Sequence, residues 1–482
     1  MSKWHTPPIE TAKNIADYAQ NLVNPSLKLG VTGLSRAGKT VFITSLIYHL
    51  LNRQNLPFFE PLTSGRLTDA YLEPHPDDLW PRFNYEGHLE QLTNTAPSWP
   101  EGTKQISQLR LTLVYQSDKF PQRLIGPSKL NIDIIDYPGE WLLDLPLMQQ
   151  GYESWSNQAQ EFAKKHHTHP AAKAWLQALE TADPTCPSNE GHAKQLSDHF
   201  RTFLQTIRSE TNSHPTLPPG RFLMPGDLEG APALTFAPLK NLPSSIPTES
   251  LAGLMKRRFE AYKDQIVAPF YYKFFTRLDR QIVLVDALEA INAGPEEVQS
   301  LKQCLSEILK SFNPGASHWL TSIWNKKIDR LVFAATKADH LHHHNHDQLQ
   351  DILSHITHEA IKTAELKGAE VKVQALAALK TTTEIEVEKN GETFKALKGT
   401  PLKGEQFQGK TFNGQDPILF FPGELPEKSD VLFKNNSKPY NTKSTPTINI
   451  VKFAPPTPGN EQTLPHIRLD RALNMLIGDQ LQ

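Results

Sequence analysis

The sequence is poor in cysteine, in net charge and in long apolar runs. Its 482 residues include two cysteines, Cys186 and Cys304, in no spacing typical of a metal or redox site, which indicates inert thiols in a reducing compartment. The formal net charge of -2 excludes a global field that attracts nucleic acid or an acidic membrane. No apolar run approaches the ~20 residues of a spanning helix, and residues 1–8 lack the apolar segment of a signal peptide. We therefore expect a cytoplasmic protein with no transmembrane segment and no nucleic-acid partner.

The chain is long, by contrast, and rich in proline. A chain of 482 residues suffices for two to four domains with a sizeable core. The 38 prolines predict many loops between the helices and strands. The sequence therefore predicts a chain with many loops between its elements rather than one compact minimal fold.

Residues 33–40 match the phosphate-binding pattern G-x-x-x-x-G-K-[ST] without a mismatch. A strand-like run, 27–32, precedes them and a helix-like apolar run, 41–50, follows. Such a loop points consecutive N–H groups at a phosphate, in front of the positive end of a helix. We predict that Lys39 reaches the β- and γ-phosphates; the alternative is a glycine-bearing turn that binds nothing. The residues expected to contact the nucleotide here are Ser35, Arg36, Ala37, Gly38, Lys39, Thr40 and Val41.

A second motif, D-x-x-G, begins at the end of a strand-like run, 130–136. Asp136 in that place can hold Mg²⁺ together with Thr40, and Gly139 can offer its N–H to the γ-phosphate. Glu140 stands where small GTPases carry a glutamine that positions water. Two roles stay open for it: a catalytic carboxylate that orients or deprotonates water, or the first residue of a helix, where an acid is favoured.

A third motif, Thr336-Lys337-Ala338-Asp339, follows the strand-like run 330–335. An Asp in this motif accepts from the N1–H and the 2-amino group of guanine, a pair of donors that adenine lacks. Thr336, Lys337 and Asp339 are therefore predicted to bind the base. The backbone of Ala377 and Ala378, in the turn after the last expected strand at 371–378, is predicted to contact the guanine O6.

Several threonines could complete the Mg²⁺ ligands, because residues 52–102 show little periodicity that would place one of them. Thr103, just before the strand-like run 106–115, is our candidate. The competing threonines are Thr63, Thr68, Thr93 and Thr95.

Five histidines crowd the turn after Asp339: His340, His342, His343, His344 and His346. A metal site and a solvated loop are both open interpretations. We favour the solvated loop, because no cysteine lies near and no helical spacing of acids accompanies the histidines.

The rest of the chain predicts an α/β domain of about five or six strands with two additions. Apolar residues at helical spacing, Trp175, Leu176, Leu179, Leu196, Phe200, Phe203, Leu204 and Ile207, predict a helical core between Trp141 and Asp279. Residues 384–398 predict a hairpin around Asn390-Gly391, and 407–421 and 448–453 predict further β-structure. Short amphipathic helices are expected at 9–23 and 464–481.

The three motifs together resemble the YcjX family of bacterial P-loop NTPases, in residues 33–47, 136–141 and 336–339. The resemblance implies a Ras-like P-loop nucleotide-binding domain with a large helical insertion and a small β-rich C-terminal addition. It also implies a link to stress responses and an inner-membrane protein as partner, hence a peripheral place at the inner membrane. Ser35 and Arg36, in place of small loop residues, and Glu140, in place of glutamine, depart from ordinary small GTPases.

We therefore expect a Mg²⁺-dependent protein that hydrolyses GTP slowly to GDP and acts as a switch. The alternatives are an ATPase of the same fold, a non-hydrolysing scaffold for a membrane-associated partner, and a small-molecule kinase. The expected division of the chain is a nucleotide domain at 1–140 and 280–380, a helical insertion at 141–279, a β-rich addition at 381–463 and a closing helix at 464–482.

Overall fold

A computed structural model describes residues 25–34, 36–74, 77–119, 126–210, 219–311, 328–389, 392–433, 448–457 and 463–482. The predicted helix at 9–23, Ser35 and the turn Asn390-Gly391 lie outside the described residues.

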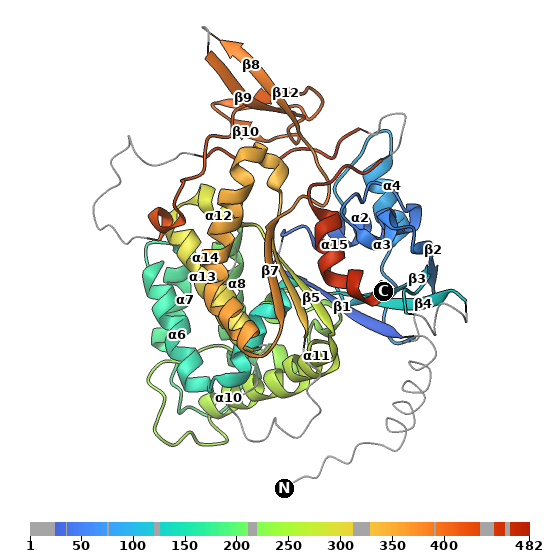
Figure 1. The fold of residues 1–482 in the computed structure, drawn as a ribbon. Coiled ribbons are helices and arrows are strands. Elements are labelled where there is room, and N and C mark those ends of the chain that lie inside the picture. The colour runs from blue at the N-terminus through green and yellow to red at the C-terminus, as the bar shows by residue number, and fades with distance from the viewer. Residues whose placement is uncertain are drawn as a thin grey trace.

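A central sheet of seven strands, in the order β2-β3-β4-β1-β5-β6-β7, organises the molecule (Figure 1). Its strands are β1 (Ser26–Gly33), β2 (Leu67–Glu73), β3 (Ser107–Tyr115), β4 (Ser128–Asp136), β5 (Arg280–Val285), β6 (Arg330–Ala335) and β7 (Glu370–Ala375). β4, β1, β5, β6 and β7 are parallel, whereas β3 runs antiparallel to both of its neighbours. Both faces of the sheet are covered by helices, so side chains on both sides of a parallel strand are buried. This is why these strands read as near-continuous apolar runs in the sequence. The predicted α/β class is confirmed.

The two faces of the sheet bury separate apolar cores. On one face, α2 (Lys39–Asn52) and α15 (Leu469–Ile477) pack with Ile282 and Leu284 of β5. On the other face, α13 (Pro295–Ser311) and α14 (His346–Leu366) pack with Val283 and Val285 of the same strand. Alternate side chains of one strand thus enter opposite cores, as strand geometry requires. In Figure 1, α13 and α14 lie to the left of β7, and α2 and α15 lie to its right.

Strand β2 was missed by the sequence analysis, which expected five or six strands. Only Leu67 and Ala70 of its seven residues are buried, so the apolar alternation is weak. Two short helices in the same region, α3 (Glu60–Thr63) and α4 (Tyr85–Thr93), were also missed.

Between β4 and β5 the described chain is mainly helical. Its helices are η1 (Gly139–Gln149), α6 (Tyr152–Lys165), α7 (Pro170–Thr181), α8 (Glu190–Glu210), α9 (Gly220–Leu223), η2 (Gly226–Leu228), η3 (Pro232–Leu234), α10 (Leu251–Tyr262), η4 (Lys263–Val267), α11 (Ala268–Lys273) and η5 (Phe275–Arg277). The Trp175 ring stacks on Phe203 with centroids 5.4 Å apart, and Trp155 stacks on Phe259 at 4.8 Å. Of the predicted core residues, Leu176 is only partly buried and the others are buried.

After β7, a three-stranded sheet of β8 (Thr383–Lys389), β9 (Glu392–Gly399) and β12 (Ile418–Phe420) projects from the body (Figure 1). Two strands of two residues each, β10 (Gln406–Phe407) and β11 (Lys410–Thr411), form an antiparallel pair beside it. Residues 448–453, expected as β-structure, form a single bridge between Phe453 and Pro401 and no strand. The closing helix begins at Leu469 instead of 464, because Ile467 pairs with Ala377 and Arg468 adopts a left-handed conformation with φ of 58°.

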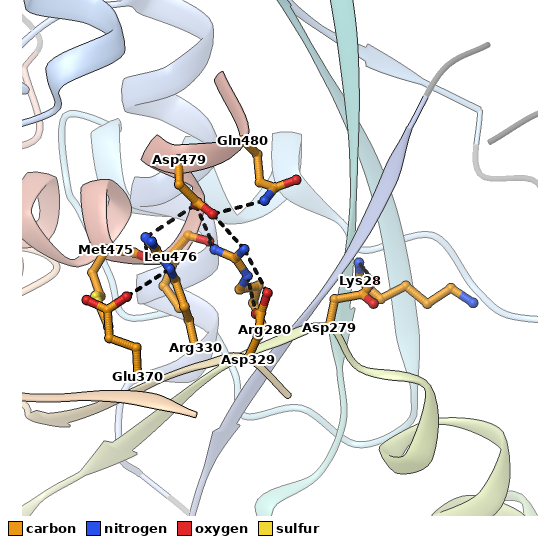
Figure 2. Close-up of polar contacts among 10 residues, drawn as sticks. All are labelled: Lys28, Asp279, Arg280, Asp329, Arg330, Glu370, Met475, Leu476, Asp479 and Gln480. Carbon is orange, nitrogen blue, oxygen red and sulfur yellow. Dashed lines mark hydrogen bonds and ion pairs between the residues drawn. The ribbon is translucent and has the colours of Figure 1, made fainter. Parts of the chain in front are cut away.

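An ion-pair network fixes the C-terminal residues to the amino edge of the sheet (Figure 2). Both guanidinium NH groups of Arg280, in β5, donate to the two carboxylate oxygens of Asp479 at 2.8 Å. Arg280 also pairs with Asp329 at 2.5 Å, and Arg330 pairs with Glu370 and Asp479 at 3.3 Å. Arg280 is almost fully buried, so its charge carries a desolvation cost. The bidentate pairing with Asp479 offsets that cost.

Asp144 joins η1 to two distant helices. Its carboxylate accepts from the backbone N–H groups of Gly220 at 2.7 Å and Arg221 at 2.8 Å, and from the Tyr262 hydroxyl at 2.7 Å. We expect Asp144→Asn to lower the free energy of unfolding by about 2 kcal/mol, because an amide NH₂ would face one of these buried donors. Urea denaturation measures the change. Asp183→Asn, at an exposed turn carboxylate, is the control and should change stability by less than about 0.5 kcal/mol; equal values for both variants would contradict the assignment.

The same carboxyl gives this prediction a pH dependence. Burial raises the pKa of Asp144 from its ordinary 3.8 to about 6, despite its hydrogen bonds. The native state therefore binds the proton more tightly than the unfolded chain, and the resulting stability is lost as pH rises through 6. Wild-type protein should lose up to about 3 kcal/mol from this group between pH 4 and 6.5, a slope that Asp144→Asn should lack.

Candidate functional site

The loops that carry the predicted motifs follow β1, β4, β6 and β7 at one edge of the sheet. Carboxyl ends of parallel strands meet at the same edge, where α/β sheets bind ligands. β5 lies between β1 and β6, so the ends of β1 and β6 are about 10 Å apart at ordinary strand spacing.

The phosphate-loop sequence forms a tight turn that leads into α2. Arg36 and Gly38 have left-handed backbone conformations, with φ of 64° and 87°. Ala37 is buried, and its N–H donates to the carbonyl of Leu34 at 3.2 Å. Lys39, Thr40 and Val41 form the first turn of α2, where backbone N–H groups have no partner within the helix.

Lys39 folds back over this turn. Its Nζ donates to the carbonyls of Gly33 at 2.9 Å and Leu34 at 3.4 Å. Burial lowers the pKa of Lys39, and the nearby carboxylates of Asp136 and Glu140 oppose that shift. The Lys39 ammonium therefore lies next to both acidic residues that the second motif supplies.

Three oxygen-bearing side chains from three segments meet beside Lys39. The hydroxyl oxygens of Thr40 and Thr103 are 3.4 Å apart, and the Thr103 hydroxyl donates to Asp136 Oδ2 at 2.7 Å. Asp136 Oδ1 is buried and has no hydrogen-bond partner among the described residues. Burial raises the pKa of Asp136 to about 6, against the opposing influence of Lys39 and Thr103. Hydroxyl and carboxylate oxygens with one unsatisfied carboxylate atom fit a Mg²⁺ ion.

The four competing threonines use their hydroxyls elsewhere. The hydroxyls of Thr63, Thr68 and Thr93 donate to the backbone carbonyls of Phe59, Val114 and Leu89, respectively. The Thr95 hydroxyl donates to the side-chain oxygen of Asn94. Thr103 is the one that contacts both Thr40 and Asp136, because β3 pairs with β4 at Ser107 and Asp136.

Gly139 packs directly on the phosphate loop. A Cβ atom on Gly139 would lie 2.9 Å from Lys39 Nζ and closer still to the carbonyl of Gly33, so this approach requires glycine. Glu140 lies in the first turn of η1 and is buried. Its Oε1 accepts from the Arg208 guanidinium of α8 at 2.5 Å. Sequence analysis missed Arg208, which only the fold brings to Glu140 from 68 positions along the chain.

The third motif forms a buried turn after β6. Asp339 Oδ2 accepts from the backbone N–H of Thr381 at 2.8 Å and from its hydroxyl at 2.5 Å. Lys337, with φ of 59°, forms an ion pair with Asp286 at the end of β5. Burial alone would lower the pKa of Lys337, but Asp286 and other nearby acids hold it above its usual value. The N–H of Thr336 donates to the carbonyl of Val285 at 2.9 Å.

The predicted contact of Ala377 with a base meets a competing bond. Its N–H donates to the carbonyl of Ile467 at 3.1 Å, so that amide is already used in the fold. Ala378 is partly exposed in the same turn. Asp286 and Thr381 were missed by sequence analysis; an acid directly after a buried strand was the available signal for Asp286.

Comparison with known proteins fits the motifs. The family model described as "YcjX-like family, DUF463" matches residues 27–481. The chain belongs to this family. The resemblance drawn from the three motifs is thereby confirmed.

Two relatives in the YcjX-like family cover nearly the whole chain. A protein of Escherichia coli (strain K12) named "Ras-like GTPase YcjX" is 34% identical over 471 residues, covering 95% of this chain and 97% of the relative. A protein of the same name from Shewanella oneidensis (strain MR-1) is 32% identical over 482 residues, covering 95% of each chain. Within the part of the chain described here, no helix combines the length and apolarity that crossing a membrane requires.

Proposed function

We propose that this protein binds Mg²⁺ and GTP and hydrolyses GTP slowly to GDP and phosphate, as a molecular switch. The observation that carries the proposal is the cluster of Thr40, Thr103 and Asp136 beside Lys39, at the same sheet edge as Asp339. Two family members named Ras-like GTPases support it.

Lys39 and the first N–H groups of α2 bind the phosphates in this proposal, together with residues 35–38. An ammonium and helix N-terminal amides stabilise the charge that phosphoryl transfer spreads over the phosphate oxygens. Thr40 and Asp136, with Thr103, would hold Mg²⁺, which when bound neutralises charge on the β- and γ-phosphates.

Guanine selection is assigned to the turn at 336–339. The carboxylate of Asp339, oriented by Thr381, accepts from N1–H and the 2-amino group. Adenine offers no such donor pair, so bound adenine would desolvate the Asp339 carboxylate without adding a hydrogen bond to it. The pairing of Lys337 with Asp286 fixes the end of the lysine, so its stem can lie over the base.

Glu140 is assigned to the attacking water, which it orients or deprotonates. Arg208 holds the Glu140 carboxylate in place and links it to α8. Gly139 lies against the phosphate loop, so loss of the γ-phosphate would shift η1 and the helices that follow it. This coupling is the proposed switch.

The remaining proposals rest on the family resemblance and on the predicted division of the chain. They are a role in stress responses, an inner-membrane protein as partner, and the nucleotide domain at 1–140 and 280–380 with additions at 141–279 and 381–463. We propose that the helical insertion at 141–279 carries the partner surface, because it directly follows Gly139 and Glu140 in the chain.

Phosphate release from GTP tests the proposal. Wild-type protein with Mg²⁺ should release phosphate from GTP, and labelled GTP should be displaced by GDP and not by ATP. Glu140→Ala should lower the rate about 100-fold, the low end for loss of a general base. Glu190→Ala, which breaks the Arg258–Glu190 pair at 2.5 Å in the insertion, is the control and should keep the wild-type rate.

Absence of turnover in wild type would favour the scaffold, and displacement by ATP would favour the ATPase. A rate raised by a small-molecule acceptor would favour the kinase. Equal rates for Glu140→Ala and Glu190→Ala would remove Glu140 from the mechanism.

A further inference from the structure

Three histidines after the base-reading turn form a compact cluster. One ring nitrogen from each of His342, His343 and His344 lies within 4.8 Å of the others. Their ring centroids are 4.2 to 4.9 Å apart. Imidazole nitrogens at this spacing need only small side-chain rotations to share one ion.

A carboxylate from a distant part of the chain completes the cluster. Glu384, in β8, accepts from the His343 backbone N–H at 2.8 Å and pairs with His343 Nδ1 at 2.7 Å. The same carboxylate lies 3.6 Å from His342 Nε2. The three imidazoles thus adjoin a carboxylate at the start of β8, which contacts His342 and His343 directly.

One of the three histidines is buried, contrary to the solvated loop that the sequence favoured. His342 is 6% exposed, and its Nδ1 has no hydrogen-bond partner among the residues the structure describes. The buried Nδ1 is therefore a donor atom that the described contacts leave available to a metal ion. His340 and His346 are also buried but do not belong to the cluster. The His340 ring packs edge-on against the Phe453 ring, and His346 Nε2 forms a hydrogen bond with the carbonyl of Ala338 at 2.9 Å.

We propose that His342, His343, His344 and Glu384 bind a divalent transition-metal ion of the zinc type. Imidazole nitrogen and carboxylate oxygen in a four-donor set suit Zn²⁺, whereas Mg²⁺ prefers oxygen ligands. The site is thus chemically distinct from the Thr40, Thr103 and Asp136 cluster.

The bound metal would connect the two loops that carry the base-reading groups. The histidines follow Asp339 by three to five residues, and Glu384 follows Thr381, the partner of Asp339, by three. Metal binding therefore holds Asp339 and Thr381 together and raises affinity for guanine nucleotide. This second step rests on the proposed function, whereas metal binding itself does not.

Titration of the full-length, tag-free and metal-stripped chain with Zn²⁺ alone tests the site. Isothermal titration calorimetry should give one ion per chain. A His342→Ala/His344→Ala variant should bind at least about 100-fold more weakly, and Glu384→Gln about 10-fold more weakly. The control is His166→Ala/His167→Ala, an adjacent pair in the insertion, which should bind as wild type does.

The metal site would be overturned if the His342→Ala/His344→Ala variant bound zinc as tightly as wild type. It would also be overturned if the wild-type protein bound no zinc. Glu384→Gln guards against misfolding, because it alters one partly exposed side chain and keeps its size. The affinity for a fluorescent GDP should rise with Zn²⁺ in wild type and not in the double variant. Unchanged GDP affinity on zinc loading would remove the coupling and leave the metal site standing; failure to bind any guanine nucleotide would count against the proposed function alone.

Discussion

Lys39→Met is expected to lower the rate of GTP hydrolysis by about 10³-fold, the upper end for loss of one charge-stabilising donor. Methionine keeps most of the volume of lysine but has no ammonium to place on the β- and γ-phosphates. Lys39 donates to the carbonyls of Gly33 and Leu34, whereas the Arg208 guanidinium is paired with Glu140, so the variant leaves no ammonium in the phosphate loop. Single-turnover phosphate release measures the effect.

The matched control is Lys263→Met. Lys263 is also a mostly buried lysine whose Nζ donates to a backbone carbonyl, that of Gln150 at 2.9 Å, but it lies in the insertion. Its substitution should leave hydrolysis within about threefold of wild type, since it contacts neither motif. A Lys39→Met rate within that same range would contradict the assignment of the phosphate site.

Asp339→Asn is expected to weaken GTP binding by at least about 100-fold and to improve binding of xanthosine triphosphate. The amide oxygen would take the place of Oδ2 and accept from Thr381 and from the base N1–H. The amide NH₂ would then face position 2, where guanine carries a donor and xanthine an acceptor. Competition against a fluorescent guanine nucleotide measures both affinities.

Asp347→Asn provides the control for the base-reading assignment. Asp347 lies in the first turn of α14, a short distance along the chain, and its exposed carboxylate pairs with Arg468 at 3.2 Å. We expect unchanged affinities for both nucleotides in this variant. If Asp339→Asn kept its preference for GTP over the xanthine nucleotide, the carboxylate of Asp339 would not read the base.

The central strands were predictable because their apolar runs are long and end in motifs. β1, β4 and β6 each carry such a run into a turn with a fixed pattern of residue types. β2 was not predictable, since an edge strand that buries two residues has almost no pattern. Thr103 could be named among five candidates because it precedes a strand, and antiparallel pairing of that strand with β4 brings it to Asp136.

Contacts between remote segments account for what the sequence did not reveal. Arg208 meets Glu140 across 68 positions, and Glu384 meets His343 across 41. Neither pair has a local pattern, because each depends on how a helix or a hairpin packs on the sheet domain. The solvated-loop interpretation of the histidines was wrong for His340, His342 and His346 for that reason.

The position of α15 on the sheet has a consequence for synthesis of the protein. Residues 469–482 leave the ribosome after every strand of the central sheet, yet Leu473, Leu476 and Leu481 complete the core beneath it. Until Asp479 emerges, the guanidinium of Arg280 lacks its bidentate partner and can pair only with Asp329 among the acids drawn in Figure 2. The nascent chain therefore displays an uncovered apolar face until residues 469–482 have been translated.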